Sequence, residues 1–311
     1  MDHPLFIHRK ENKKPSTSLQ KALADATKTL HTSGVDSPGL DAEVLLGEVL
    51  GISRSQLYAR LQEPVESKDL NRFHKLVNKR AHRIPLQYLT GHTEFMSLDF
   101  LVKKGIFVPR PETELAVEAV LEKASEGVNI GSRLKILDIG TGCGNIAISI
   151  AVGLQNFRGH VMVYASDISS KALKLARLNA KIHNVEANIS FCKGSLYQAI
   201  KGLGLEGEID FIVSNPPYVA RDEWKRLQPE VRDYEDPRAL VAGDDGLECY
   251  RKIVGDAHRW LRPGGWLIME LGEDQAAKVK ELTYKNGHLM DTETIRDLQG
   301  IERIIVARSG R

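Results

Sequence analysis

The order of apolar and polar residues divides the chain into two parts with different periods. Between residues 16 and 83, apolar side chains recur at every third or fourth position, as Leu19, Leu23, Ala26 and Leu30 do. This spacing places them on one face of a helix, so we expect this part to be wholly helical.

Residues that typically begin or end helices also occur between residues 16 and 83. Residues 36–51 supply a capping residue, a proline in the first turn and Gly51 as a stop. Ser53 and Gln56 have the spacing of a capping box, and Ser67 stands where it can cap the next helix. That helix has one basic face, which is either an ordinary solvated surface or a docking face for an acidic partner or RNA. The basic residues are Arg72, Lys75, Lys79, Arg80 and Arg83.

Beyond a bridging stretch, the pattern changes from helices to alternating strands and helices. Alternating apolar residues from Phe95 to Val102 predict a short hairpin, and Pro109 and Pro111 lead into a helix that begins near Glu112. From Arg133 onward, short apolar strands alternate with helical segments, which predicts a parallel, doubly wound sheet. We expect strands at 134–140, 160–167, 188–194, 209–215 and 265–271, and helices at 145–154, 169–183 and 249–261.

The composition limits the class of protein but does not indicate a function. The chain has 311 residues, enough for two domains, with 27% charged residues and a formal net charge of +2. Cys143, Cys192 and Cys249 are far apart and odd in number, and the histidines show no metal-ligand spacing. We therefore expect neither a disulfide framework nor a metal site. There is no apolar run long enough for a membrane helix and no secretory signal, so we expect a cytoplasmic protein.

Polar residues stand where the expected strands end: Asp138, Asp167, Asn215 and Glu270. Ligands of such sheets bind beyond the carboxyl ends of the strands. Asp167 can accept hydrogen bonds from ribose hydroxyls, although it or Ser169 can instead cap the following helix.

A glycine-rich loop follows the first strand of the sheet. Gly140, Gly142 and Gly144 allow positive φ and a close approach of the backbone to a ligand. A dinucleotide fingerprint requires glycine at the position of Asn145, so the loop suits a ligand without a pyrophosphate. Together with Asp167, this pattern is typical of S-adenosylmethionine enzymes as well as nucleotide enzymes.

The strand 209–215 ends in the sequence Asn-Pro-Pro-Tyr at residues 215–218. One interpretation is a turn, since prolines end a strand. The other is a site for a planar amide or amine: the side-chain oxygen of Asn215 and the carbonyl of Pro216 accept its N–H groups, and Tyr218 provides a flat face. Methyl transfer needs such alignment and stabilisation of developing positive charge, with no strong base.

The chain resembles the peptide chain release factor N5-glutamine methyltransferases, the HemK/PrmC family, from about residue 35 to 308. The specific segments are PLQYLTG (85–91), VPRPETE (108–114), LDIGTGCGNIAI (137–148), SNPPYV (214–219), YEDPRALVAGDDGL (234–247) and DLQGIERIIVAR (297–308). The resemblance implies a helical, substrate-docking domain at 1–90, a hairpin linker at 91–110 and a Rossmann-like class I methyltransferase domain at 111–311. It also implies methylation of the glutamine in the Gly-Gly-Gln motif of class I, bacterial-type release factors.

The resemblance further assigns residues by position. Those implied to bind S-adenosylmethionine are Gly140, Thr141, Gly142, Cys143, Gly144, Asp167 and Asn215. Those implied to hold the glutamine are Asn215, Pro216, Pro217 and Tyr218, approached past Arg110 and Glu112. The family often has Asp-Trp beside the adenine, where this chain has Ser195 and Leu196, so an aliphatic surface is expected there.

Three alternatives remain open. An adenine-N6 methyltransferase acting on DNA or RNA can use the same Asn-Pro-Pro-Tyr chemistry, but it needs a basic, aromatic-rich groove, and the aromatic content is 6%. A binding module with an inactive cofactor pocket is disfavoured by the intact motif at 215–218. A redox dehydrogenase is disfavoured by Asn145.

Overall fold

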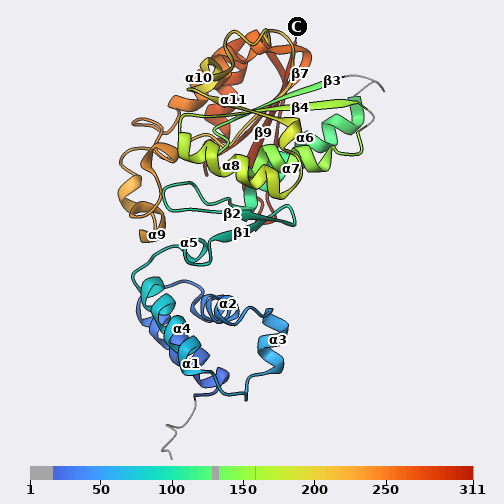
Figure 1. Ribbon diagram of the computed structural model, residues 1–311. Coiled ribbons are helices and arrows are strands. Elements are labelled where there is room, and N and C mark those ends of the chain that lie inside the picture. The colour runs from blue at the N-terminus through green and yellow to red at the C-terminus, as the bar shows by residue number, and fades with distance from the viewer. Residues whose placement is uncertain (1–16, 128–132, 158, 311) are drawn as a thin grey trace, which may run out of the picture. The chain divides into compact units, whose positions relative to one another are not determined.

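The computed structural model describes residues 17–127, 133–157 and 159–310, and the chain divides into two compact units, Met1–Thr90 and Gly91–Arg311 (Figure 1). The helical period expected for the first unit is confirmed. Its helices are α1 (Leu19–Thr32), α2 (Pro38–Leu50), α3 (Arg54–Ala59), α4 (Ser67–Ala81) and α5 (Leu86–Thr90). They enclose a core of their own, built from the apolar faces that the sequence pattern marks; its fully buried members include Leu30, Leu45, Leu46, Leu57 and Phe73.

Local signals account for most of the helix ends in this unit. The capping box is present, since Ser53 and Gln56 exchange side-chain bonds with each other's backbone N–H groups at 2.9 and 3.2 Å. Gly51 ends α2 in the left-handed conformation. The expectation for Ser67 is wrong: Glu66 holds the extended backbone of the cap position, so Ser67 is already the first helical residue.

One member of the expected basic face is internal. Arg80 is buried, and its Nε lies 2.6 Å from Oδ2 of Asp41 in α2. Because the carboxylate of Asp41 pairs with it across two helices, Arg80 stabilises the packing of α4 against α2 instead of facing a partner. Of the five residues expected on the basic face, Arg72, Lys75 and Lys79 are exposed on α4.

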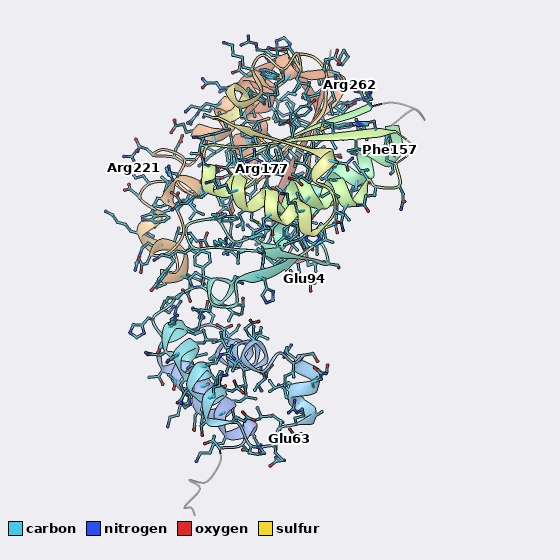
Figure 2. All side chains as sticks on the ribbon, viewed as in Figure 1. Glu63, Glu94, Phe157, Arg177, Arg221 and Arg262 are labelled. Carbon is cyan, nitrogen blue, oxygen red and sulfur yellow. The ribbon has the colours of Figure 1, made fainter. Side chains whose placement is uncertain are left out.

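The second unit begins with the expected hairpin. Strands β1 (His92–Phe95) and β2 (Leu98–Leu101) are antiparallel, and Met96 and Ser97 both take positive φ in the tight turn between them. Phe95 is buried, whereas its neighbour Glu94 is exposed (Figure 2). The 3₁₀ helix η1 (Pro111–Thr113) then leads into α6 (Glu114–Gly127).

Seven strands form the central sheet in the order β5-β4-β3-β6-β7-β9-β8. The first five positions in this order are parallel, as expected, but β9 runs antiparallel to both β7 and β8. Residues 297–301 join β8 to β9, too short a connection for a crossover, so an antiparallel pair results. The strands are β3 (Arg133–Ile139), β4 (His160–Asp167), β5 (Ile189–Lys193), β6 (Ile209–Ser214), β7 (Leu261–Glu270), β8 (Leu289–Arg296) and β9 (Glu302–Ser309).

Alternate residues of the strands supply two separate cores, one on each face of the sheet. In β6, for example, Phe211 and Val213 belong to one core and Ile212 to the other. Helices α6, α7 (Asn145–Gly153) and α8 (Ser170–Ile182) cover the first face, and α10 (Glu248–Trp260) and α11 (Ala276–Asn286) cover the second (Figure 1). The short helix α9 (Pro229–Arg232) lies in the long connection from β6 to α10. None of the helices in the described part of the chain is long and apolar enough to span a membrane.

Candidate active site

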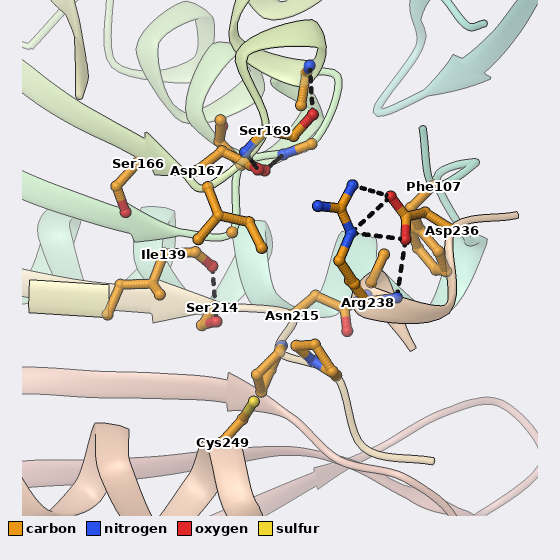
Figure 3. Close-up of a pocket in the computed structure, with 18 of the residues that line it drawn as sticks. Phe107, Ile139, Ser166, Asp167, Ser169, Ser214, Asn215, Asp236, Arg238 and Cys249 are labelled. Carbon is orange, nitrogen blue, oxygen red and sulfur yellow. Dashed lines mark hydrogen bonds and ion pairs between the residues drawn. The ribbon is translucent and has the colours of Figure 1, made fainter. Parts of the chain in front are cut away.

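The carboxyl ends of neighbouring strands meet at one edge of the sheet, and a cavity opens there (Figure 3). Asp167 at the end of β4 and Asn215 after β6 both line it. Asp138, the penultimate residue of β3, is fully buried, and burial raises the pKa of its carboxyl to about 7. Glu270 ends β7 behind the cavity wall. The structure therefore places a cavity at the strand ends that the sequence marks with polar residues.

The glycine loop forms one wall of the cavity. Gly140 and Gly142 line it, together with Thr141, and have φ values of 78° and 57°. Cys143 and Gly144 are not among the lining residues. The Cys143 thiol is buried, which raises its pKa to about 12. A Cβ on Gly144 would lie 3.0 Å from Cβ of Ala176, so this glycine lets α7 pack closely against α8.

Asp167 holds the loop in place while facing the cavity. Its Oδ2 accepts the backbone N–H of Gly142 at 3.0 Å, and its Oδ1 accepts that of Ser169 at 2.7 Å (Figure 3). Ser169 itself caps α8 through the N–H of Ala172. The capping role at this strand end therefore belongs to Ser169, and the ribose role of Asp167 stays a prediction. Burial raises the pKa of Asp167, and each carboxylate oxygen keeps a lone pair for a further donor.

All four residues of the Asn-Pro-Pro-Tyr sequence line the cavity. The Nδ2 of Asn215 donates to the Oγ1 of Thr113 at 3.0 Å, and that hydroxyl donates to Oε2 of Glu270 at 2.5 Å. Among the described residues, no hydrogen bond is made by Oδ1 of Asn215. The amide is therefore anchored by its nitrogen and leaves its oxygen as an acceptor.

Close packing fixes the end of this sequence. The carbonyl of Tyr218 accepts a bond from Nε2 of Gln275 at 2.9 Å. A Cβ on Gly246, which has φ +73°, would meet the same carbonyl, so only glycine fits there. The hydroxyl of Tyr218 lies 3.5 Å from Oε1 of Glu270. Burial raises the pKa of that phenol.

Several lining residues were not predicted from the sequence. Thr113, Phe107, Asp236, Arg238 and Cys249 all line the cavity. Arg238 is held by Asp236 through an ion pair of 2.7 Å (Figure 3). The only sequence signal for this pair is the DPRAL segment. Leu196 lines the cavity as expected, with a positive φ of 49°. Arg110 and Glu112 are not among the lining residues.

The lining suits S-adenosylmethionine in its chemistry. Asp167 offers an acceptor for ribose hydroxyls, and Ile168 and Leu196 offer apolar surface for a flat ring. The glycine loop, free of side chains at Gly140 and Gly142, lets the backbone approach the ligand. Within residues 17–127, 133–157 and 159–310, no three His, Cys, Asp or Glu side chains are grouped to hold a metal ion.

The mostly parallel sheet and the glycine loop beside an acidic strand end define a class I, S-adenosylmethionine-dependent methyltransferase, and residues 130–303 match the family described as methyltransferase domain. Residues 21–91 match the family described as PrmC N-terminal domain. The chain belongs to the release factor glutamine methyltransferase family, as its similarity to the curated relatives shows.

Two of these relatives are release factor glutamine methyltransferases. That of Moorella thermoacetica is 40% identical over 291 residues, covering 93% of this chain and 98% of the relative. That of Geobacter sulfurreducens is 38% identical over 293 residues, covering 94% and 97%. Among solved structures, the hMettl16 catalytic domain in complex with the MAT2A 3'UTR hairpin 6 has a TM-score of 0.53 at 19% identity, covering 69% of this chain and 76% of that one. That similarity shows a shared fold alone.

Proposed function

We propose that this enzyme transfers a methyl group from S-adenosylmethionine to the side-chain amide nitrogen of the glutamine in the Gly-Gly-Gln motif of class I, bacterial-type release factors. The observation that carries the proposal is the amide of Asn215, whose nitrogen is held by Thr113 and whose oxygen remains an acceptor at the cavity wall. Such an acceptor is complementary to the NH₂ group of a substrate amide. The names of the relatives from Moorella and Geobacter support the same substrate.

The cofactor supplies an electrophilic methyl group carried on a sulfonium sulfur. Gly140, Thr141, Gly142 and Asp167 hold it in this proposal, with Leu196 as an apolar surface for the adenine. Cys143 and Gly144 act indirectly, because they are packed behind the loop and hold its backbone in place.

The chain's own residues position the glutamine. Asn215 Oδ1 and the carbonyl of Pro216 accept the two N–H groups of the substrate amide, which directs its nitrogen and stabilises the positive charge that develops there. Pro216 and Pro217 restrict the backbone, and Tyr218 provides a face for the planar group. No strong base is needed, because the methylated nitrogen carries positive charge and gives one N–H proton to water as the neutral product amide forms.

The remaining assignments follow the same proposal. Arg110 and Glu112 shape the approach to the cavity rather than its wall. The helical unit docks the release factor, because it has its own core and none of the residues that line the cavity. A cytoplasmic location fits the three cysteines, which are all unpaired.

The test is mass spectrometry of the Gly-Gly-Gln peptide after incubation of an intact release factor with the enzyme and S-adenosylmethionine. We expect a gain of one methyl group on the glutamine. A Gly-Gly-Gln to Gly-Gly-Ala release factor serves as the control, and an adenine-containing RNA or DNA is assayed in parallel. Methylation of the nucleic acid in place of the glutamine would refute the proposal.

A further inference from the structure

Three side chains from separate parts of the second unit form one hydrogen-bonded series. Asn215 donates to Thr113 at 3.0 Å, and Thr113 donates to Glu270 at 2.5 Å. Thr113 and Glu270 are only 1% and 3% exposed, so water does not compete for these bonds. Asn215 and Thr113 line the cavity, whereas Glu270 lies behind them.

Glu270, at one end of this series, decides which group donates and which accepts in each bond. An ionised carboxylate only accepts hydrogen bonds, and a threonine hydroxyl has a single hydrogen to give. If that hydrogen goes to Glu270, the Thr113 oxygen can act only as an acceptor toward Asn215. Asn215 must then turn its NH₂ to Thr113, which leaves its oxygen for the substrate.

We propose that Glu270 is a positioning residue that acts through Thr113 to determine which end of the Asn215 amide faces the substrate. This inference rests on the proposed function, because it concerns the acceptor that holds the substrate NH₂ group. Glu270 touches neither the substrate nor the cofactor in this arrangement.

A neutral donor at position 270 reverses the series. A glutamine has both an NH₂ group and a carbonyl oxygen, so it no longer commits the Thr113 hydrogen to position 270. When its NH₂ group donates to Thr113, that hydrogen turns to Asn215 Oδ1, and the Asn215 amide rotates to accept it. The cavity then presents an NH₂ group to the substrate NH₂ group, so two donors face each other. Glu270→Gln makes this change with almost no change in volume.

Protonation of Glu270 has the same consequence, so the groups that face it matter. Thr113 and Glu112 face it from η1, Tyr218 from the loop after β6, Tyr250 from α10 and Arg303 from β9. Burial raises the pKa of Glu270 to about 7, with Glu112 adding to the rise and Thr113, Arg303 and Tyr218 opposing it. Activity therefore falls as the pH drops below about 7, because a carboxyl protonated on Oε2 donates to Thr113 instead of accepting from it.

The experiment measures kcat and KM on intact release factor, and the Kd for S-adenosylmethionine, in the full-length protein. We expect Glu270→Gln to lower kcat by about a hundredfold, the scale of one preorganised polar partner, with the cofactor Kd within about threefold of wild type. Asp210→Asn is the matched control: Asp210 is a buried carboxylate at the opposite end of β6, where it pairs with Arg262. We expect its kcat to be unchanged.

A double-mutant cycle separates positioning from a structural effect. In an Asn215→Ala background, Glu270→Gln should lower kcat no further, since the residue through which it acts is gone. Thr113→Ser keeps the hydroxyl and should retain the wild-type pH profile of kcat. Thr113→Val removes the hydroxyl, so its kcat should no longer decline below pH about 7. These two variants test the inference even if Glu270→Gln does not fold. Additive effects of Glu270→Gln and Asn215→Ala, or a wild-type kcat in Glu270→Gln, would overturn the inference. A wild-type protein that leaves the release factor unmethylated would refute the proposed function instead.

Discussion

Nη2 of Arg110 lies 2.5 Å from Oε1 of Glu235, an ion pair between residues 125 positions apart. The Glu235 side chain is 1% exposed and that of Arg110 is 30% exposed. Each belongs to a segment that contributes to the cavity, since Phe107 precedes Arg110 and Asp236 follows Glu235. The pair therefore fastens two separate walls of the active site to each other without lining it.

Removal of the arginine should be costly because it leaves a buried carboxylate without its counter-charge. We expect Arg110→Ala to lower the free energy of unfolding by about 3 kcal/mol. A double variant, Arg110→Ala with Glu235→Gln, should lose clearly less, since a neutral amide needs no cation. Urea denaturation at pH 7 measures both. Equal losses in the two variants would mean that the packing of the arginine matters and its charge does not.

Glu270 links stability to pH in the opposite sense to most carboxylates. Its folded-state pKa of about 7 lies above the ordinary value of 4.5, so folding favours the neutral form. This contribution is fully present below pH 4.5 and is lost as the pH rises through 7, an effect of about 3 kcal/mol. Relative to Glu270→Gln, wild type should become less stable between pH 5 and 8. Urea denaturation of both proteins at both pH values measures this, and a constant difference would contradict the assignment.

How far the sequence predicts the structure depends on how local each signal is. The strands and helices from 133 to 271 follow from their periods, and the capping box at Ser53 follows from four residues. Strand β8 escaped prediction because it lies at the edge of the sheet and has few buried residues. Helix α11 and β9 were likewise not assigned.

The candidate site shows the same limit more sharply. A glycine-rich loop and a carboxylate at a strand end are local signals, so the sequence predicts that Gly140, Gly142 and Asp167 lie together, and they do line one cavity. Thr113 was missed although it lies in the VPRPETE segment, because that segment does not show that folding brings its hydroxyl to Asn215, 102 positions away. Arg80 was misassigned for the same reason, since its partner Asp41 lies 39 positions earlier.

Asp167 should contribute directly to cofactor binding. We expect Asp167→Ala to weaken S-adenosylmethionine binding by about 1.5–3 kcal/mol, the scale of charge-assisted hydrogen bonds. The loss has two sources, since the carboxylate also anchors the N–H of Gly142. Asp167→Asn keeps an acceptor without the charge and should lose less. Calorimetry measures both affinities, and an unchanged affinity in Asp167→Ala would exclude the ribose assignment.

Leu196 tests the expected adenine surface. The residue lines the cavity with φ +49°, so a tryptophan there takes on the same backbone strain as the leucine. We expect Leu196→Trp to preserve or tighten cofactor binding, by up to about 1 kcal/mol from added aromatic contact. Leu196→Ala, which removes apolar surface, should weaken it. A large loss in the tryptophan variant at an unchanged melting temperature would place the adenine elsewhere.

The helical unit should be separable from the cofactor site. Its buried residues form a core without members from the second unit, which has separate cores of its own. We expect a protein that begins at Gly91 to fold and to bind S-adenosylmethionine. Its kcat/KM on whole release factor should drop sharply, while weak activity on a free Gly-Gly-Gln peptide should change little. The difference arises because a second domain supplies remote binding energy that orients the glutamine.

We expect this docking to occur at three exposed basic residues of α4, Arg72, Lys75 and Lys79. Reversal of these three charges in the full-length protein should reproduce the truncation defect in milder form, because screened surface charges contribute modestly to association. The defect should shrink as salt is raised. Reversal of Lys21 and Lys28, two exposed lysines on α1, is the matched control and should leave kcat/KM unchanged. Equal losses on peptide and whole factor after truncation would show that the helical unit supports the catalytic fold, and docking through α4 would have to be abandoned.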